Sequence, residues 1–263
     1  MKYLTKKNRA ILREMVSTDF KVRYQGSVLG YVWSLLRPLL QFATLYIIFV
    51  YVFKIGRGVE HFPVYLLFGI VMWNFFVEAT STGMTAVVAN GDLLRKISIP
   101  RFLVVVATSV SAVINFCLNL IIVGVAAMIN GVHPSVEWLW MLPVFIELFI
   151  FSQAMAFFLC ALFVKFRDIN YIWEVLIQAA FYGTPILYGL QMVPAKYQQW
   201  IMLNPMAQII QDARHAMLGN TAVTSWSILS LKYALIPLVI VVVAVIGSTL
   251  YFKKESREFA ENL

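Results

Sequence analysis

The chain has 263 residues, of which 61% are hydrophobic and 13% are charged, and its formal net charge is +8. Soluble domains carry charge on about a quarter of their residues, so this composition excludes an ordinary soluble fold and predicts an all-α membrane protein. The basic residues lie mostly beside apolar segments, which favours contact with membrane lipids and excludes nucleic acid as the expected partner.

The N-terminal segment at 2–20 predicts an amphipathic helix in the membrane interface. Its apolar residues recur at helical spacing on one face, and a basic stripe that includes Lys6, Arg9 and Arg13 runs beside that face. A solvated basic tail is the alternative, but the spacing argues against it. The first long apolar run begins only near residue 35, so we expect this segment to be retained and not cleaved as a signal peptide.

Six apolar segments are long enough to cross, as helices, a hydrocarbon core of roughly 30 Å. They cover residues 35–53, 62–86, 102–129, 136–164, 171–188 and 233–252. The segment at 171–188 is the least regular, because Glu174, Gln178, Gly183 and Pro185 interrupt it. We expect one transmembrane domain over residues 1–263, with the interface helix and its linker at 1–30.

Lysine and arginine gather on one side of these predicted spans. That side holds both tails and the loops near residues 95 and 166, whereas the other side holds few basic residues. Because positive charge prefers the cytoplasm, the pattern predicts that both termini are cytoplasmic.

The cytoplasmic loop at 90–101 mixes charged and apolar residues. We expect Asp92 to cap a short helix that ends before Pro100. Such a helix between two spans can transmit movement from a soluble partner. A simple loop whose basic residues fix the topology explains the charges equally well.

The segment at 189–232 is too long for a turn and too apolar for an ordinary loop. Two short helices are predicted at 195–203 and 205–218, with Pro205 in the first turn of the second and Gly219 after its end. Neither can span a bilayer, so we expect a re-entrant hairpin on the outer side. An external surface loop is the alternative.

The sequence carries no motif for catalysis. It lacks a Gly-rich phosphate loop, and Cys117 and Cys160 lie inside apolar runs without disulfide or metal spacing. We therefore expect no cofactor or metal on this chain. A membrane enzyme such as a lipid-carrier transferase would need paired acidic or histidine residues near one membrane face, and these are not found.

Six motifs follow one another over nearly the whole chain. They read DFKVRY at 19–24, GSVLGYVWSLLRP at 26–38, LLRKISIPR at 93–101, KFRDI at 165–169, TPILY at 184–188 and LNPM at 203–206. Together they resemble the type-2 ABC exporter permeases, above all those that export lipid-linked O-antigen, capsule or teichoic acid. A type-2 permease for a drug or small lipid is the alternative, and a structural scaffold would not need the loop at 90–101.

The resemblance implies a homodimer in a bacterial cytoplasmic membrane with two copies of a separate ATPase, which would bind ATP and magnesium. It also implies that the interface helix lies near the ATPase and that a helix in the loop at 90–101 contacts it. The implied ATPase-coupling residues are Asp92, Leu93, Leu94, Arg95, Lys96, Ile97 and Arg101. The implied gate residues near the exit are Trp200, Asn204 and Pro205.

Two features are candidates for the lining of a polysaccharide conduit. Phe42, Tyr46, Phe49 and Phe53 recur at helical spacing, and aromatic rings can stack on sugar faces and still allow sliding. Packing against neighbouring spans is the alternative for this stripe. Glu147 lies within the fourth span, where a carboxylate usually faces water or the bundle interior. We expect Glu147 or Glu78 to pair with a polar residue, either Asn74, Asn115, Asn119 or Gln153, and a purely structural hydrogen bond is the alternative.

Overall fold

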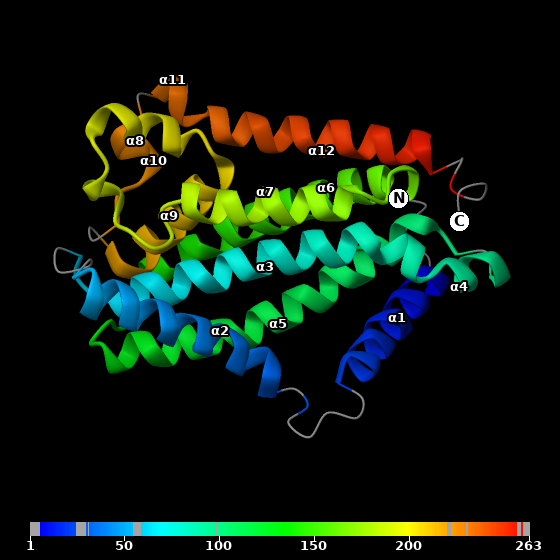
Figure 1. The fold of residues 1–263 in the computed structure, drawn as a ribbon, viewed down its shortest axis with the longest axis horizontal. Helices are drawn as coiled ribbons and strands as arrows, with labels where there is room; N and C mark the ends of the chain where they lie inside the picture. The colour runs from blue at the N-terminus through cyan, green and yellow to red at the C-terminus, as the bar shows by residue number, and fades with distance from the viewer. Residues whose placement is uncertain are drawn as a thin grey trace.

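The computed structural model describes residues 6–24, 30, 32–54, 59–97, 99–219, 222–229, 231–256 and 259. Within this part of the chain the elements are all helical, and none is a strand. Figure 1 shows long helices lying side by side, with α4 at one end of the bundle and α8, α9 and α10 at the other. These are called the α4 end and the α8 end below. Residues 2–5 of the predicted interface helix, residues 26–29 and 31 of the second motif and residue 98 of the third motif lie outside the described residues.

Five helical segments in the described residues are long and apolar enough to cross a membrane. They are α2 (Val32–Tyr46) continued by the π-helical η1 (Ile47–Val52), α3 (Phe62–Ala89), α5 (Arg101–Ile129), η2 (Val136–Trp140) continued by α6 (Met141–Lys165), and α12 (Ile236–Glu255). They coincide with five of the six predicted spans.

The remaining predicted span, at 171–188, differs from the expectation. Its helix, α7 (Ile169–Gly183), has 15 residues and ends before Pro185. At 1.5 Å per residue it is about 22 Å long, which is less than the hydrocarbon core of a bilayer. The chain then turns at Thr184, whose hydroxyl donates to the carbonyl of Ala180 at 2.8 Å.

The remaining helices lie towards the two ends of the bundle. They are α1 (Lys6–Tyr24), α4 (Gly91–Lys96), η3 (Leu190–Met192), α8 (Ala195–Met202), α9 (Pro205–Leu218), α10 (Ser225–Ile228) and α11 (Leu231–Ala234). The two short helices predicted after residue 189 are confirmed as α8 and α9. Pro205 stands in the first turn of α9, the Asn204 side chain accepts from the Met206 amide at 3.0 Å, and Gly219 ends the helix with a φ of 63°.

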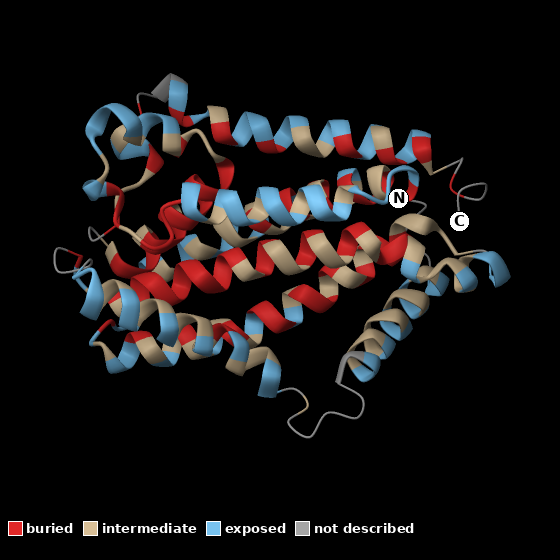
Figure 2. Ribbon diagram, viewed as in Figure 1, coloured by how far each residue is buried: buried red, intermediate tan, exposed pale blue. Residues whose placement is uncertain are grey.

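Helix α3 lies at the centre of the fold, and Figure 2 shows it as the most continuously buried helix of the bundle. It packs against α5 and α6 along most of its length and also contacts α2, α7 and α9. Aromatic rings fill these contacts, including Phe76 on Phe151 with centroids 5.5 Å apart and Phe75 on Phe116 at 4.9 Å. Gly83 lets α6 approach closely, because a Cβ there would lie 2.6 Å from the Cβ of Ala156.

The expectation that Asp92 caps the short cytoplasmic helix is wrong. The cap position of α4 is Asn90, and Asp92 lies exposed in the first turn without a capping hydrogen bond. The Asn90 side chain donates instead to the carbonyl of Ala86 at 2.9 Å, which also accepts from the Asn90 amide, so Asn90 reinforces the end of α3. Leu93 and Leu94 are half-buried, and Leu94 packs on the core at the α4 end, so their side chains are less available to a partner than the sequence predicts.

A candidate transport cavity

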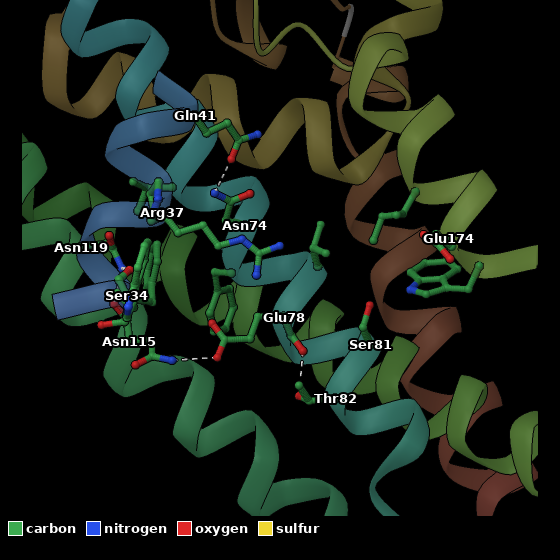
Figure 3. Close-up of a pocket in the computed structure, with 18 of the residues that line it drawn as sticks. Ser34, Arg37, Gln41, Asn74, Glu78, Ser81, Thr82, Asn115, Asn119 and Glu174 are labelled. Carbon is green, nitrogen blue, oxygen red and sulfur yellow. Dashed lines mark hydrogen bonds between the residues drawn. The ribbon is translucent and has the colours of Figure 1, made fainter. Parts of the chain in front are cut away.

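A cavity of about 890 Å³ lies between α2, α3, α5 and α7 (Figure 3). Its walls come from the first half of α2, the middle of α3 and α5, and the first half of α7. The polar residues that line it are Ser34, Arg37, Gln41, Asn74, Glu78, Ser81, Thr82, Asn115, Asn119, Asn170 and Glu174. Polar side chains at membrane depth normally face water or a substrate path, so this cavity is the best candidate for a transport site.

Hydrogen bonds between helices fix three of its walls to one another. The amide of Asn74 donates to Gln41 Oε1 at 2.9 Å and joins α3 to α2. The amide of Asn115 donates to Glu78 Oε1 at 2.7 Å and joins α5 to α3. Asn119 donates to the carbonyl of Ser34 at 3.3 Å and joins α5 to α2.

The cavity also offers polar atoms to a ligand. Asn115 Oδ1 and Trp173 Nε1 are buried at its edge without a hydrogen-bond partner, one an acceptor and the other a donor. Figure 3 shows the exposed Arg37 side chain extending into the cavity between Asn74 and Glu78. This mixture of donors and acceptors matches hydroxyl groups, which both donate and accept.

The predicted aromatic stripe is interrupted. Its helical spacing ends at Tyr46, because the next six residues are π-helical. The rings then form two pairs, Phe42 with Tyr46 at 5.5 Å and Phe49 with Phe53 at 5.7 Å. The first three of these four residues pack on the core around α3, whereas Phe53 is 61% exposed, and none of the four lines the cavity. Their contacts favour the packing alternative.

Glu147 lies away from this cavity, in a second cavity of about 540 Å³ between α6, α9 and α12. Its partner is Gln208 of α9, whose amide nitrogen lies 3.4 Å from Glu147 Oε2 and 2.8 Å from Asp212 Oδ2. Burial raises the pKa of Asp212 above its usual value, while hydrogen bonds from Gln208 and Ser225 oppose that shift. Sequence reasoning missed Gln208 because it searched for a partner only within the predicted spans.

Arg214 is a further polar residue that the sequence pattern did not single out. It is fully buried in α9 and donates to three carbonyls, those of Tyr65 at 3.0 Å, Pro185 at 2.6 Å and Ile186 at 2.9 Å. Burial lowers its pKa to about 10, while Tyr65 opposes that shift, so the guanidinium stays charged at neutral pH. Arg214 therefore fixes α9 to α3 and to the turn after α7.

The predicted gate residues lie in different environments. Trp200 is 71% exposed on α8. Asn204 caps α9 and its amide lies 3.3 Å from the hydroxyl of Thr184, while Pro205 is buried at the start of α9. The contact of Asn204 with Thr184 holds the start of α9 to the turn after α7.

The predicted ATPase-coupling and interface residues gather at the α4 end. Asp92, Arg95, Lys96 and Ile97 are exposed on and beside α4, and Arg101 is half-buried with its guanidinium 5.8 Å from the ring of Phe259. On α1 the basic side chains of Lys6, Arg9 and Arg13 are exposed, while this helix packs against α5. Figure 1 shows α1 and α4 at the same end of the molecule.

Comparison with known proteins identifies the family. Residues 12–218 match the family described as ABC-2 type transporter. The chain belongs to this family. It is a transport protein, and the resemblance drawn from the six motifs is confirmed. The ABC-2 chain is 29% identical over 256 residues to the O-antigen export system permease protein RfbA of Klebsiella pneumoniae, covering 96% of this chain and 95% of that protein.

Two further relatives of this ABC-2 chain carry related names. The O-antigen export system permease protein RfbA of Myxococcus xanthus is 27% identical over 260 residues, which cover 97% of this chain and 96% of that protein. The polysialic acid transport protein KpsM of Escherichia coli is 20% identical over 201 residues, covering 76% and 78%. The names of all three relatives refer to export or transport of a saccharide polymer.

Proposed function

We propose that this chain is the membrane subunit of an ATP-driven exporter that moves a lipid-linked polysaccharide across a bacterial cytoplasmic membrane. The observation that carries the proposal is the polar cavity between α2, α3, α5 and α7, in a chain whose relatives are named for export of O-antigen and polysialic acid. Arg37, Asn115 Oδ1 and Trp173 Nε1 offer scattered donors and acceptors. A sliding polymer needs many weak contacts of this kind rather than one tight site.

The working unit in this proposal is a homodimer. Helices α2 and α7 border the cavity, yet both carry exposed apolar side chains, among them Leu40, Tyr171 and Leu176. A second copy that covers these surfaces would close the cavity into a path between two chains. In the same proposal α7 and the turn after it make the sixth crossing of the membrane, and α8 and α9 form a re-entrant gate at the outer side.

Two ATPase subunits would meet the α4 end, which we assign to the cytoplasm together with both termini. The exposed Arg95, Lys96 and Ile97 on and beside α4 and the basic face of α1 support this assignment. We expect ATP and magnesium on those subunits and no cofactor on this chain. Because α4 connects α3 to α5, and Glu78 joins these two helices at the cavity, displacement of α4 by the ATPase would move two of its walls.

The test uses cells in which the gene for this chain is deleted and then restored with a variant. Deletion should abolish surface polysaccharide and cause the lipid-linked polymer to accumulate inside the cell. Restoration with Arg37→Ala, which removes a charged contact worth about 1.5–3 kcal/mol, should leave export at least about tenfold below wild type at equal membrane abundance. Lys54→Ala, which alters an exposed basic residue outside the cavity and the gate helices, is the control and should restore export.

Unchanged surface polysaccharide in the deletion strain would contradict the proposed substrate. Loss of drug resistance or of a small lipid in that strain would instead support the alternative ABC-2 substrate. Normal export by Arg37→Ala would show that the polymer does not use this cavity.

A further inference from the structure

The second cavity, between α6, α9 and α12, combines an apolar wall with a polar end. Its wall is made by side chains of α6 and α12, including Ile146, Ile150, Val242 and Ile246. These four are 39% exposed or more, so the wall faces out of the single chain towards lipid. Its polar end is formed by Glu147, Gln208 and Asp212. The cavity is called the lateral groove below.

The polar end has more hydrogen-bond acceptors than its own donors satisfy. Glu147 Oε1 and Gln208 Oε1 are buried without a partner, and Gln208 is only 5% exposed. The amide nitrogen of Gln208 already serves Glu147 Oε2 and Asp212 Oδ2. A buried acceptor without a donor costs about 1–3 kcal/mol, so a ligand that brings N–H groups would be stabilised here.

The charges at the polar end favour the same kind of ligand. The polar end has two carboxyl groups, and the nearest basic residues neutralise neither of them. The guanidinium of Arg214 already donates to three backbone carbonyls, those of Tyr65, Pro185 and Ile186. His215 lowers the pKa of Asp212 only as the last of several influences, and its Nδ1 lies 2.9 Å from the carbonyl of Ala222. A cation would offset the carboxyl charges.

We propose that the lateral groove binds a phospholipid with a primary ammonium headgroup, of the phosphatidylethanolamine type. The ammonium has three N–H donors for Glu147, Gln208 and Asp212, and an acyl chain can lie along the apolar wall of α6 and α12. Glu147 lies eleven residues into the span that begins at Val136, so it is nearer to that end of the span than to Lys165. A headgroup would therefore enter the groove from the Val136 end. A bare metal ion would use only the polar end and not the wall.

The experiment compares lipids that differ only in their headgroups. The complex of this permease with its ATPase subunit is placed in nanodiscs containing equal amounts of phosphatidylethanolamine, phosphatidylcholine and phosphatidylglycerol with identical chains. Lipids that stay bound after release into the gas phase are counted by native mass spectrometry. Charge-assisted hydrogen bonds worth about 1.5–3 kcal/mol predict at least about tenfold preference for phosphatidylethanolamine over phosphatidylcholine, whose headgroup has no N–H donor.

Two sets of variants test the two parts of the groove. The double variant Glu147→Gln and Asp212→Asn should lose the preference, whereas Glu137→Gln, an exposed carboxylate outside the groove, should keep it. Val242→Trp fills the wall with both carboxyl groups intact and should also lose bound phosphatidylethanolamine. Its control is Val243→Trp, on the same helix but outside the groove and 62% exposed.

Equal retention of phosphatidylethanolamine and phosphatidylcholine by the wild type would overturn the proposal, and so would retention in Val242→Trp. Because Val242→Trp leaves the polar end unchanged, the test does not depend on folding of the double variant. The lipid count is independent of export, so its failure would leave the proposed polysaccharide substrate untouched.

Discussion

Helices α3 and α7 both form walls of the same polar cavity, yet they are held in very different ways. In the most apolar stretch of α3, 78% of the residues are buried inside the chain, whereas α7 has no buried residue. Figure 2 shows the contrast as a mostly red α3 beside a mostly pale blue and tan α7. The cavity therefore has one wall fixed by packing and another that the single chain holds loosely, which is the arrangement expected of a path that must change width.

Glycines explain much of this difference. Gly69 and Gly83 lie where α3 meets the Arg214 side chain and the Ala156 Cβ, and both approaches are closer than a Cβ would allow. On α7 the contacts with α3 come from the rings of Trp173 and Phe181, 6.2 Å from Phe76 and 5.9 Å from Trp73 respectively. Substitutions along the two helices should therefore have graded effects.

The largest effect is expected from Gly69→Ala. The new Cβ would overlap the Arg214 side chain and displace the guanidinium from its three carbonyls. A buried charge that loses its partners costs about 3–5 kcal/mol, so the thermal unfolding temperature in detergent and the yield of folded protein should both fall sharply. The control is Gly124→Ala in α5, where a Cβ meets nothing within 4 Å. Equal stability of the two variants would show that Arg214 does not fix α9 to α3.

A smaller loss is expected from Gly83→Ala. Here the Cβ would lie 2.6 Å from the Cβ of Ala156, a short side chain that cannot turn aside. Overpacking of this kind costs about 1–3 kcal/mol. The second change Ala156→Gly removes the obstructing methyl group and should restore most of the unfolding temperature. A double variant no more stable than Gly83→Ala would exclude this contact as the cause.

Much of the fold follows from the sequence, because membrane helices must satisfy their own backbone groups and so appear as apolar runs of fixed length. Five helices long and apolar enough to span were predictable on this basis and are confirmed, whereas α8 and α9 were predicted from Pro205 and Gly219 at the ends of α9. Helix α7 was harder, because Glu174 and Gln178 reduce its apolar character and Pro185 follows closely. Hydropathy alone could not tell that it would end at Gly183.

The cavity was predictable only in part. The sequence singled out Glu78, Asn74, Asn115 and Asn119 as polar residues at membrane depth, and all four line the cavity. Which of them would meet depends on the rotation of each helix about its axis, which composition does not fix. The π-helical η1 after Tyr46 changes that rotation within the first span, so a stripe deduced from α-helical spacing could not be extended to Phe53.

The smallest effect on stability is expected from Val175→Ala combined with Leu176→Ala on the outward face of α7. These side chains are 66% and 54% exposed, and substitutions at exposed positions usually change the free energy of unfolding by less than about 0.5 kcal/mol. Phe181→Ala on the same helix should cost more, because it removes the ring that contacts Trp73. Unfolding temperatures of the two variants, measured at the same protein concentration, make the comparison.

The same double variant also tests what covers α7. If a second copy packs on this face, its dimer fraction, measured by light scattering in detergent, should fall while the protomer remains folded. Val243→Ala on α12, equally exposed but away from the cavity, should leave that fraction unchanged. The opposite result is a double variant that is as unstable as Phe181→Ala but keeps its dimer fraction. That result would mean that the outward face of α7 packs within the single chain, so α7 would not be a loosely held wall.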